Sequence, residues 1–225
     1  TLAYALSRSS NIVSIKTFLR IGADPIVSLA KKCHLEGPIH PYPSLALGCI
    51  DVTLKETLGS FNIFANSGYY VEPHSINWVK DRWGKKIWRF NGEPEMIVSP
   101  IISSKVAKVL GIGIERVRKL IYKGNWLSSE AISKTGTTND SRTCWFVGAT
   151  PSLVTAVYIG CDDNRPMGNV YPVQTALPIW KDIHENLPDK QKNFVFDQSL
   201  TLTHVHASTG QIVDPTDENA LAIYT

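Results

Sequence analysis

Residues 131–138 (AISKTGTT) and the two apolar stretches that follow them decide the fold. Thr143 to Ala149 and Leu153 to Gly160 are rich in β-branched and aromatic residues, and a turn near Pro151-Ser152 separates them. Runs of this kind, bounded by turn residues, predict β-strands. The three segments therefore predict an antiparallel sheet, with Lys-Thr-Gly-Thr at the end of its first strand.

Helical patterns flank this predicted sheet. Apolar residues recur at i, i+3 and i+4 through residues 1–32, apart from a polar patch at residues 7–11. The Ser and Asn side chains of that patch suit the end of one helix and the cap of the next. Gly22 and Asp24-Pro25 then separate a second helix from a third. Further helices are predicted at residues 53–66, 100–122 and 179–187, so the fold class is α/β (α+β).

Two hairpins are predicted outside the central sheet. The first joins residues 76–80 and 86–90, and its basic residues alternate with tryptophans. This mixture of basic and aromatic residues is compatible with a nucleic-acid platform, but any half-buried hairpin with solvated charges shows the same alternation. The second hairpin spans residues 200–213. His204 and His206 share a face of it without a third ligand, so we expect a solvated pair, no metal and no cofactor.

Composition narrows the function classes. The 225 residues are 43% apolar, enough for one large domain with its own core. Their 23 basic and 20 acidic residues leave a net charge of only +3, which makes no case for nucleic acid or an anionic membrane. No apolar run reaches the roughly 20 residues of a membrane span, and no signal peptide is present. Four cysteines without a C-x-x-C pair indicate neither a disulfide scaffold nor zinc.

The motif that carries chemistry is Lys134-Thr135-Gly136-Thr137. It places an ammonium group and two hydroxyls beside a backbone that a substrate can approach at Gly136. An amide just beyond can face a developing oxyanion, and Lys134 with the hydroxyls suits a carboxylate. The competing interpretation is an exposed strand end followed by a polar turn at residues 138–141.

Lys-Thr-Gly is one of three elements of the penicillin-recognising serine enzymes. Ser9-Ser10-Asn11 fits the second element, and it lies at the helix break before the predicted sheet. With these and further ordered matches, the sequence resembles the C-terminal part of the transpeptidase domain of class A (bifunctional) penicillin-binding proteins. The further matches are residues 43–48 (PSLALG), 64–70 (FANSGYY), 145–151 (WFVGATP), 158–163 (YIGCDD), 178–180 (PIW) and 208–210 (STG).

The resemblance implies roles for the site residues. Ser9 would relay a proton to the leaving amine, and Asn11 would bind the substrate amide and orient the catalytic lysine. Lys134, Thr135 and Thr137 would hold the terminal carboxylate of a D-Ala-D-Ala stem peptide or of a β-lactam. Gly136 and Thr138 complete the implied substrate-binding set, and the backbone amide of Thr137 would form half of the oxyanion hole. Such sites work through an acyl-serine intermediate.

The resemblance also implies a β-lactamase/transpeptidase-like fold: an antiparallel sheet flanked by helices plus an all-helical subdomain, here incomplete at the N-terminus. The family's nucleophilic S-x-x-K precedes the Ser-x-Asn motif, whereas Ser28-Leu29-Ala30-Lys31 follows it and is expected to be a decoy. The mid-helix start at Thr1 indicates a fragment, which would leave one side of the strand at 153–160 unpaired. We expect a transpeptidase part at residues 1–187 and a β-rich extension at 188–225.

Implied partners are the peptidoglycan stem peptide with lipid II-derived glycan strands, β-lactams, and the upstream part of the same polypeptide, with no nucleic acid. The implied location is the bacterial cell envelope, at the periplasmic or outer face of the inner membrane, with the anchor in the upstream part. Ser133 and Thr143-Cys144 differ from the residues usual in the family at these positions. We therefore expect the penicillin affinity to differ from that of typical members.

Three other functions are compatible with parts of the pattern. A serine β-lactamase of class A would need an E-x-x-L-N loop, and the sequence contains no such string. A non-catalytic wall-synthesis scaffold or substrate-binding module would keep the fold, although the intact Ser9, Asn11 and Lys134 favour an enzyme. A plain binding module would require the ordered matches to have arisen by chance.

Overall fold

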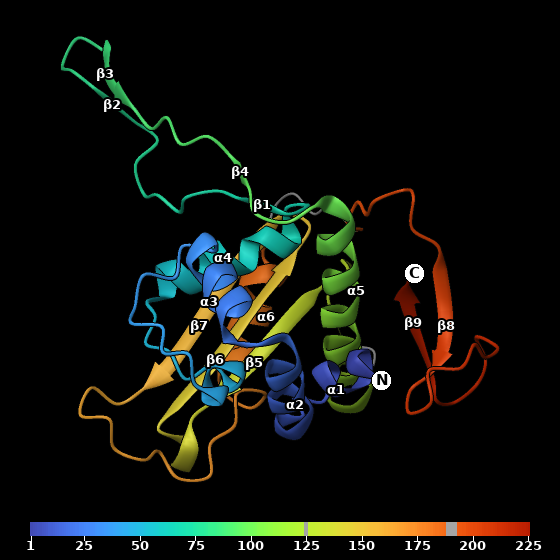
Figure 1. Ribbon diagram of the computed structural model, residues 1–225. Coiled ribbons are helices and arrows are strands. Elements are labelled where there is room, and N and C mark those ends of the chain that lie inside the picture. Colours follow the sequence, from blue (N-terminus) through green and yellow to red (C-terminus); the bar gives the residue numbers. More distant parts are fainter. Residues whose placement is uncertain (124–125, 188–192) are drawn as a thin grey trace.

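The computed structural model describes residues 1–123, 126–187 and 193–225 (Figure 1). Its centre is an antiparallel sheet of three strands in the order β5-β6-β7: β5 (Ile132–Thr137), β6 (Thr143–Thr150) and β7 (Leu153–Gly160). Lys134 pairs with Val147, and Gly136 pairs with Trp145. These are the three strands that the sequence predicts. Within the described residues β7 pairs with β6 alone, so its other edge is open, as expected.

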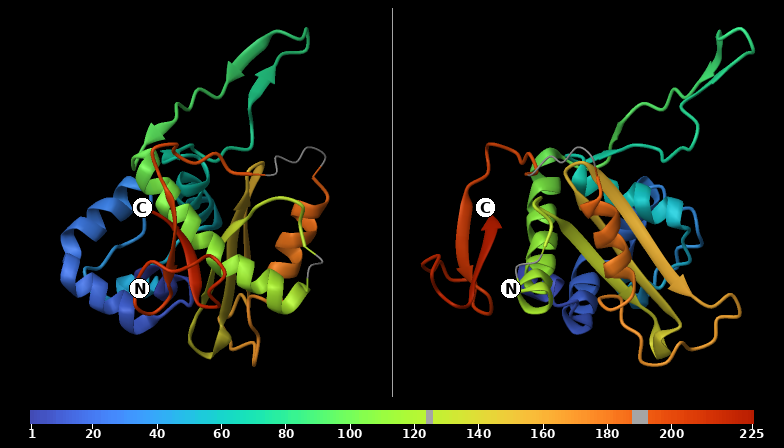
Figure 2. Two further views of the ribbon diagram at one scale, coloured as in Figure 1. Left: turned by 90° about the vertical axis from the view of Figure 1, so that its right-hand side faces the viewer. Right: turned by 180° about the vertical axis from the view of Figure 1, so that it is seen from behind.

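Helices cover both faces of this sheet. On one face α4 (Leu54–Ala65) and α5 (Pro100–Val117) pack Phe61 and Leu110 against Ile132 and Val147. On the other face α6 (Ala176–Glu185) buries Trp180 against Phe146, and Figure 2 shows this helix in front of the strands when the molecule is seen from behind. The residues with odd and even numbers on β6 thus enter two different cores, as alternation along a strand requires. The arrangement confirms the predicted fold class.

Helix α5 passes without a break through two glycines that lower its helix propensity. A Cβ atom at Gly113 would lie 3.6 Å from the Ser7 carbonyl, and one at Gly111 would lie 3.6 Å from the Ala131 carbonyl. The glycines therefore face the elements against which α5 packs, namely α1 (Leu2–Ser7) and β5. The helix ends in a single π-turn, η2 (Arg118–Tyr122), inside the range predicted as helical.

The N-terminal region consists of α1, α2 (Asn11–Ile21) and α3 (Ala23–Lys32), with breaks at Ser9 and Gly22. Gly22 has φ +89°, a conformation that glycine adopts at little cost. A proline-rich loop and a 3-10 turn, η1 (Pro43–Leu47), connect α3 to α4. Thr53 and Glu56 form a capping box at the start of α4, which fixes where that helix begins.

Two peripheral hairpins complete the described chain, besides the short strands β1 (Tyr69–Tyr70) and β4 (Glu95–Met96) and the turn η3 (Asn139–Ser141). The first hairpin, β2 (Trp78–Lys80) with β3 (Lys86–Arg89), lies where it was predicted and projects from the body (Figure 1). The second hairpin forms in part, but its main strand partner is another segment. The strand β8 (Leu202–His206) pairs with β9 (Ala220–Tyr224), while the predicted partner segment makes the bridge Val205–Ile212 and two backbone hydrogen bonds, from the His206 amide to the Gln211 carbonyl and from the Val213 amide to the His204 carbonyl.

The reason for this pairing is tertiary packing. β9 lies along α5, where Lys108 stands over the ring of Tyr224 at 5.7 Å. The helix start predicted at residue 179 also moves, because Ala176 and Leu177 are fully buried and extend α6 at its N-terminal end. Over the described ranges, none of the helices combines the length and the apolar character that crossing a bilayer would need.

Candidate active site

The candidate site joins two segments that lie 125 residues apart in the chain. Nζ of Lys134 donates a hydrogen bond of 2.6 Å to Oγ of Ser9 and a second one of 2.9 Å to the Thr135 carbonyl. Lys134 lies on the face of the sheet that α4 and α5 cover, in register with Val147 of their core. The helix break and the strand end, predicted independently, thus meet.

The Ser9 side of the site is a tight break between two helices. The amide of Ser9 bonds to the Leu6 carbonyl, and the amide of Ser10 bonds to the Ala5 carbonyl. Ser9 itself has φ +51°, which is uncommon for a residue with a Cβ and costs on the order of 1 kcal/mol or more. Strain of this kind concentrates where a side chain must be aimed in one direction, and here the direction is toward Lys134.

Asn11 is the first residue of α2, follows the N-cap residue Ser10, and is exposed. The described contacts record no hydrogen bond from its side chain to Ser9 or Lys134. The structure therefore brings Ser9 and Lys134 together and leaves Asn11 two residues after Ser9, at the start of α2.

The β5 side presents the rest of the motif. Thr135 and Gly136 are half-buried, whereas Thr137 at the end of the strand is exposed. A Cβ atom on Gly136 would lie 3.3 Å from Cβ of Trp145, so the cross-strand neighbour also favours a glycine here. Oγ1 of Thr138 accepts a hydrogen bond of 2.9 Å from the Thr143 amide and thereby closes the turn after the strand.

The electrostatics favour an anionic ligand. Burial lowers the pKa of Lys134 from its ordinary value, because taking an ammonium group out of water disfavours its charged form. Over the described ranges no carboxylate forms an ion pair with Lys134, so its positive charge is not neutralised within the protein. A carboxylate bound here would pair with the charge of Lys134 and would accept hydrogen bonds from the hydroxyls of the motif.

The S-x-x-K string at residues 28–31 lies elsewhere. It belongs to α3, which packs against α2, and Ser28 is exposed on the surface of that helix. The geometry agrees with the expectation that this string is a decoy.

Sequence reasoning missed an aromatic pair beside the motif. Trp145 and Tyr158 stand next to Gly136 in one cross-strand row, with ring centroids 4.8 Å apart in an edge-to-face arrangement. Tyr158 is 42% exposed, so the row ends in an accessible aromatic surface. The strand register, counted from the turn at Pro151-Ser152, is the signal that would have aligned these residues.

Known proteins resemble this chain along most of its length. No protein-family model matches it. Penicillin-binding protein 1A of Rickettsia conorii is 28% identical over 236 residues, which cover 94% of this chain and 30% of the relative. The protein of the same name from Neisseria meningitidis is 33% identical over 193 residues, which cover 81% of this chain and 24% of the relative. The chain thus spans less than a third of the length of these relatives.

Solved structures show the same fold. The crystal structure of penicillin-binding protein 1A from Haemophilus influenzae matches 99% of this chain and 39% of its own, with a TM-score of 0.83 and 21% identity. The PonA1 protein from Mycobacterium tuberculosis in complex with penicillin V matches 88% of this chain and 58% of its own, with a TM-score of 0.74 and 20% identity.

Proposed function

We propose that the chain is part of a penicillin-binding protein and that it supplies the proton-relay and carboxylate-binding parts of a serine D,D-transpeptidase active site. The observation that carries this proposal is the hydrogen bond of 2.6 Å between Lys134 and Ser9. It joins the two motifs to which we assign the reaction: a hydroxyl on the helical side and a cation on the strand.

The strand side binds the substrate. The ammonium group of Lys134, with the hydroxyls of Thr135 and Thr137, holds the terminal carboxylate of a D-Ala-D-Ala stem peptide. The half-buried position of Lys134 strengthens this pairing, because the interaction is less screened than at an open surface. The backbone amide of Thr137 faces the scissile carbonyl as half of the oxyanion hole, and Gly136 and Thr138 complete the substrate-binding set.

The helical side moves the proton. A serine nucleophile attacks the carbonyl of the penultimate D-alanine, the C–N bond breaks, and an acyl-serine forms. The departing D-alanine amine takes its proton through Ser9. Ser9 already accepts a hydrogen bond from Lys134, so its own O–H remains free to donate. In the second half the amine of another stem peptide attacks the acyl-serine and forms the cross-link. Asn11 holds the substrate amide at this loop.

We place the nucleophilic serine and its lysine in a part of the polypeptide outside residues 1–225. In this proposal Ser28, which is exposed on α3, does not take this role. In this proposal residues 1–187 belong to the transpeptidase domain and residues 188–225 form an extension, and the protein works at the periplasmic or outer face of the inner membrane. Its partners are peptidoglycan strands derived from lipid II, β-lactams and the upstream part of the same polypeptide.

The experiment is labelling with a fluorescent penicillin, followed by denaturing electrophoresis. The full-length polypeptide should form a covalent adduct, whereas residues 1–225 alone should not. Lys134→Ala in the full-length polypeptide should slow acylation on the order of a hundred-fold or more, the loss typical of removing one preorganised charge-stabilising group. The matched control is Lys105→Ala, which removes an exposed lysine of α5 and should leave acylation unchanged.

Other outcomes would overturn parts of this proposal. A labelled Ser28 in residues 1–225 would contradict the placement of the nucleophile. An unlabelled full-length polypeptide would favour the non-catalytic scaffold over the enzyme.

A further inference from the structure

The hairpin formed by β2 and β3 is unlike the rest of the molecule in its exposure. Every residue of both strands is exposed, including Trp78 at 47% and Trp88 at 47%. At the turn, Trp83 is 76% exposed. The two strands pack substantially only on each other. A two-stranded hairpin with both faces in water is marginally stable, so its apolar side chains call for a partner surface.

The hairpin also concentrates the positive charge of the chain. Residues 78–89 hold five of the 23 basic residues and one of the 20 acidic residues, which leaves 18 basic and 19 acidic residues elsewhere. The hairpin therefore has a net charge of +4 in twelve residues, whereas the whole chain of 225 residues has a net charge of +3. The five basic residues are Lys80, Arg82, Lys85, Lys86 and Arg89.

Internal contacts do not neutralise these charges. Over the described ranges no carboxylate forms an ion pair with the five cations. Asp81 is the only acidic residue of residues 78–89, and its Oδ1 accepts the backbone amides of Trp83 and Lys85 at 2.9 Å each. Its carboxylate thus closes the turn. Two of the cations rest on aromatic rings instead: Lys80 lies 4.6 Å from the centroid of Trp78, and Arg82 lies 4.2 Å from that of Trp83.

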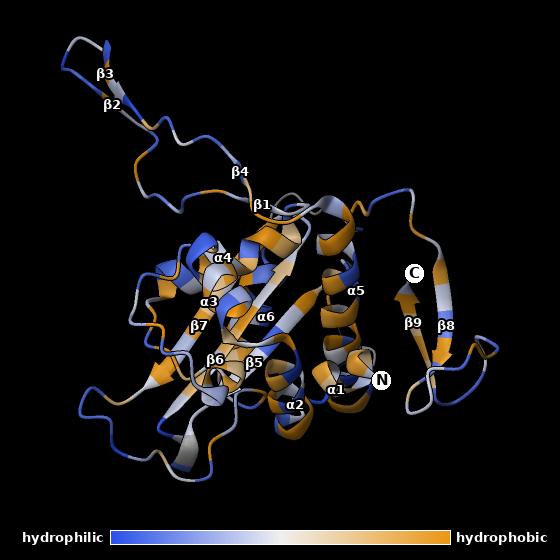
Figure 3. Ribbon diagram, viewed as in Figure 1, coloured by the Kyte–Doolittle hydropathy of each residue, from blue (hydrophilic) through white to orange (hydrophobic). Residues whose placement is uncertain are grey.

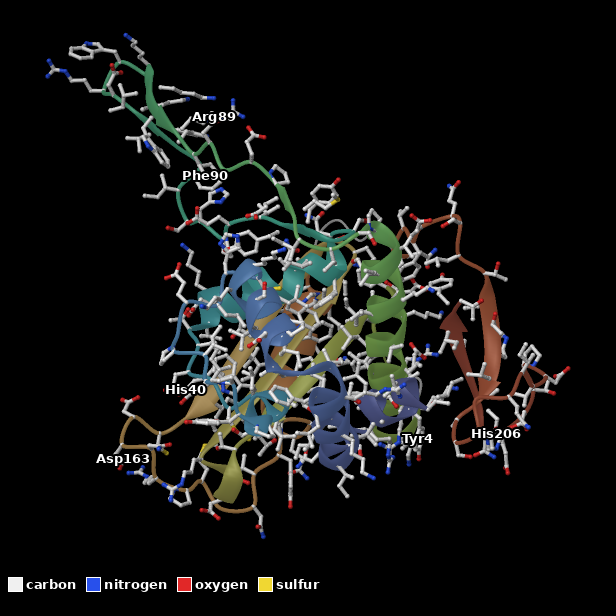
Figure 4. The ribbon with its side chains drawn as sticks, viewed as in Figure 1. Tyr4, His40, Arg89, Phe90, Asp163 and His206 are labelled. Carbon is white, nitrogen blue, oxygen red and sulfur yellow. The ribbon has the colours of Figure 1, made fainter. Side chains whose placement is uncertain are left out.

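The base of the hairpin is braced so that it points away from the body. His74 stacks on Phe90 with ring centroids 3.6 Å apart, and its Nε2 lies 2.8 Å from Oδ1 of Asn77. The amide of Phe90 bonds to the Asn77 carbonyl. Figure 4 shows Arg89 and Phe90 on this stem, with the side chains beyond them extending into solvent. Figure 3 shows that the hairpin is largely hydrophilic, in contrast to α5.

We propose that this hairpin docks on the surface of an anionic phospholipid bilayer. Tryptophan side chains favour the boundary between headgroups and hydrocarbon, and lysine and arginine favour anionic headgroups. The exposed Trp83 and Ile87 provide the apolar contact, and the five cations provide the charge complementarity. A soluble polyanion such as RNA would use the charges but would leave Ile87 in water, so the bilayer accounts for more of the surface.

The test is sedimentation of residues 1–225 with vesicles of phosphatidylcholine mixed with phosphatidylglycerol, compared with vesicles of phosphatidylcholine alone. We expect binding to the anionic vesicles, a loss of binding as salt is raised, and quenching of tryptophan fluorescence by brominated lipid. The variant carrying K80Q, R82Q, K85Q and K86Q should bind roughly several hundred-fold more weakly, because each of the four cations near an anionic leaflet strengthens binding about five-fold.

The control variant carries K16Q, R20Q, K31Q and K32Q. It removes the same charge from exposed positions of α2 and α3 and should retain binding. Equal losses in the two variants would show a general charge effect and overturn the proposal. Absence of binding to anionic vesicles would do the same, as would preferential binding of the hairpin to polyuridylic acid. The readout is independent of penicillin labelling, so failure here leaves the proposed function standing.

Discussion

The central sheet and the projecting hairpin use similar residues in opposite ways. In the sheet, Phe146 is 1% exposed and packs with Trp180, which is fully buried under α6. In the hairpin, Trp78 and Trp88 lie in the open. Both regions alternate aromatic, β-branched and polar residues. The two regions therefore differ in whether a helix packs over the strands, and not in their strand pattern. The covered sheet stabilises the fold, whereas the uncovered hairpin is available to a partner.

The largest difference between the two regions should be in stability. Trp180→Ala removes a fully buried side chain whose Nε1 donates to the Gly148 carbonyl at 3.1 Å, and we expect a loss of about 3–5 kcal/mol in the free energy of unfolding. Trp83→Ala should change it by less than about 0.5 kcal/mol. Urea unfolding measures both. Comparable losses would contradict the distinction between a covered and an uncovered region.

A second difference concerns pH. His184 is 2% exposed, and its two ring nitrogens lie 3.0 Å from the hydroxyls of Thr150 and Thr155. Burial lowers the pKa of His184 from 6.5 to about 4. The unfolded chain binds this proton more readily, so its stabilising contribution is complete above about pH 6.5 and is lost as the pH falls toward 4.

The expected loss over that range is about 3 kcal/mol. His184→Gln should remove this part of the acid sensitivity in urea titrations at several pH values. His40→Gln, which changes an exposed histidine of the proline-rich loop, should retain it. If the two variants have the same pH profile of unfolding free energy, then the buried contacts of His184 with Thr150 and Thr155 do not determine the acid sensitivity.

Two glycines provide a smaller contrast. A Cβ atom at Gly148 would lie 3.0 Å from the Ile132 carbonyl and 3.1 Å from the ring of Trp180, so Gly148→Ala should cost about 1–3 kcal/mol. Gly84 has φ +86° in the hairpin turn, with nothing within 4 Å, so Gly84→Ala should cost at most about 1 kcal/mol of local strain. Unfolding by denaturant measures both losses. A larger loss for Gly84→Ala than for Gly148→Ala would contradict the described packing of Gly148 in the sheet.

The smallest effect on stability should come from the cations of the hairpin. The variant carrying K80Q, R82Q, K85Q and K86Q should unfold within about 0.5 kcal/mol of the parent, because the side chains are exposed and the cations form no ion pairs in the described part of the chain. A larger loss would mean that these residues support the fold, and vesicle binding would have to be interpreted again.

The sequence patterns were sufficient to predict most helices and strands, but they were less informative about which strands pair. The three strands of the sheet follow from β-branched runs and a Pro-Ser turn. The pairing of β8 with β9 does not, because β9 lies beyond the local turn and contacts with α5 hold it in place, while residues 211–213 bond to the other edge of β8. Local pattern contains no information on that packing.

The candidate site shows the same limit. The two motifs could be recognised, and their meeting was expected from the resemblance. The left-handed backbone of Ser9 could not be foreseen, because it depends on how α1 packs on α5, whereas the aromatic row of Trp145 and Tyr158 required the exact strand register. The roles of Asn11, Thr135, Thr137 and Thr138 stay predictions.

The central claim is that Ser9 and Lys134 act as one unit in acylation, and a double-mutant cycle tests it most directly. The acylation rate of the full-length polypeptide by a fluorescent penicillin would be measured for Ser9→Ala, Lys134→Ala and the double variant. Each single change should slow acylation on the order of a hundred-fold or more, and the double variant should be little slower than either, because groups that act together are non-additive. Losses that multiply would contradict the account, as would single variants that acylate at the parent rate.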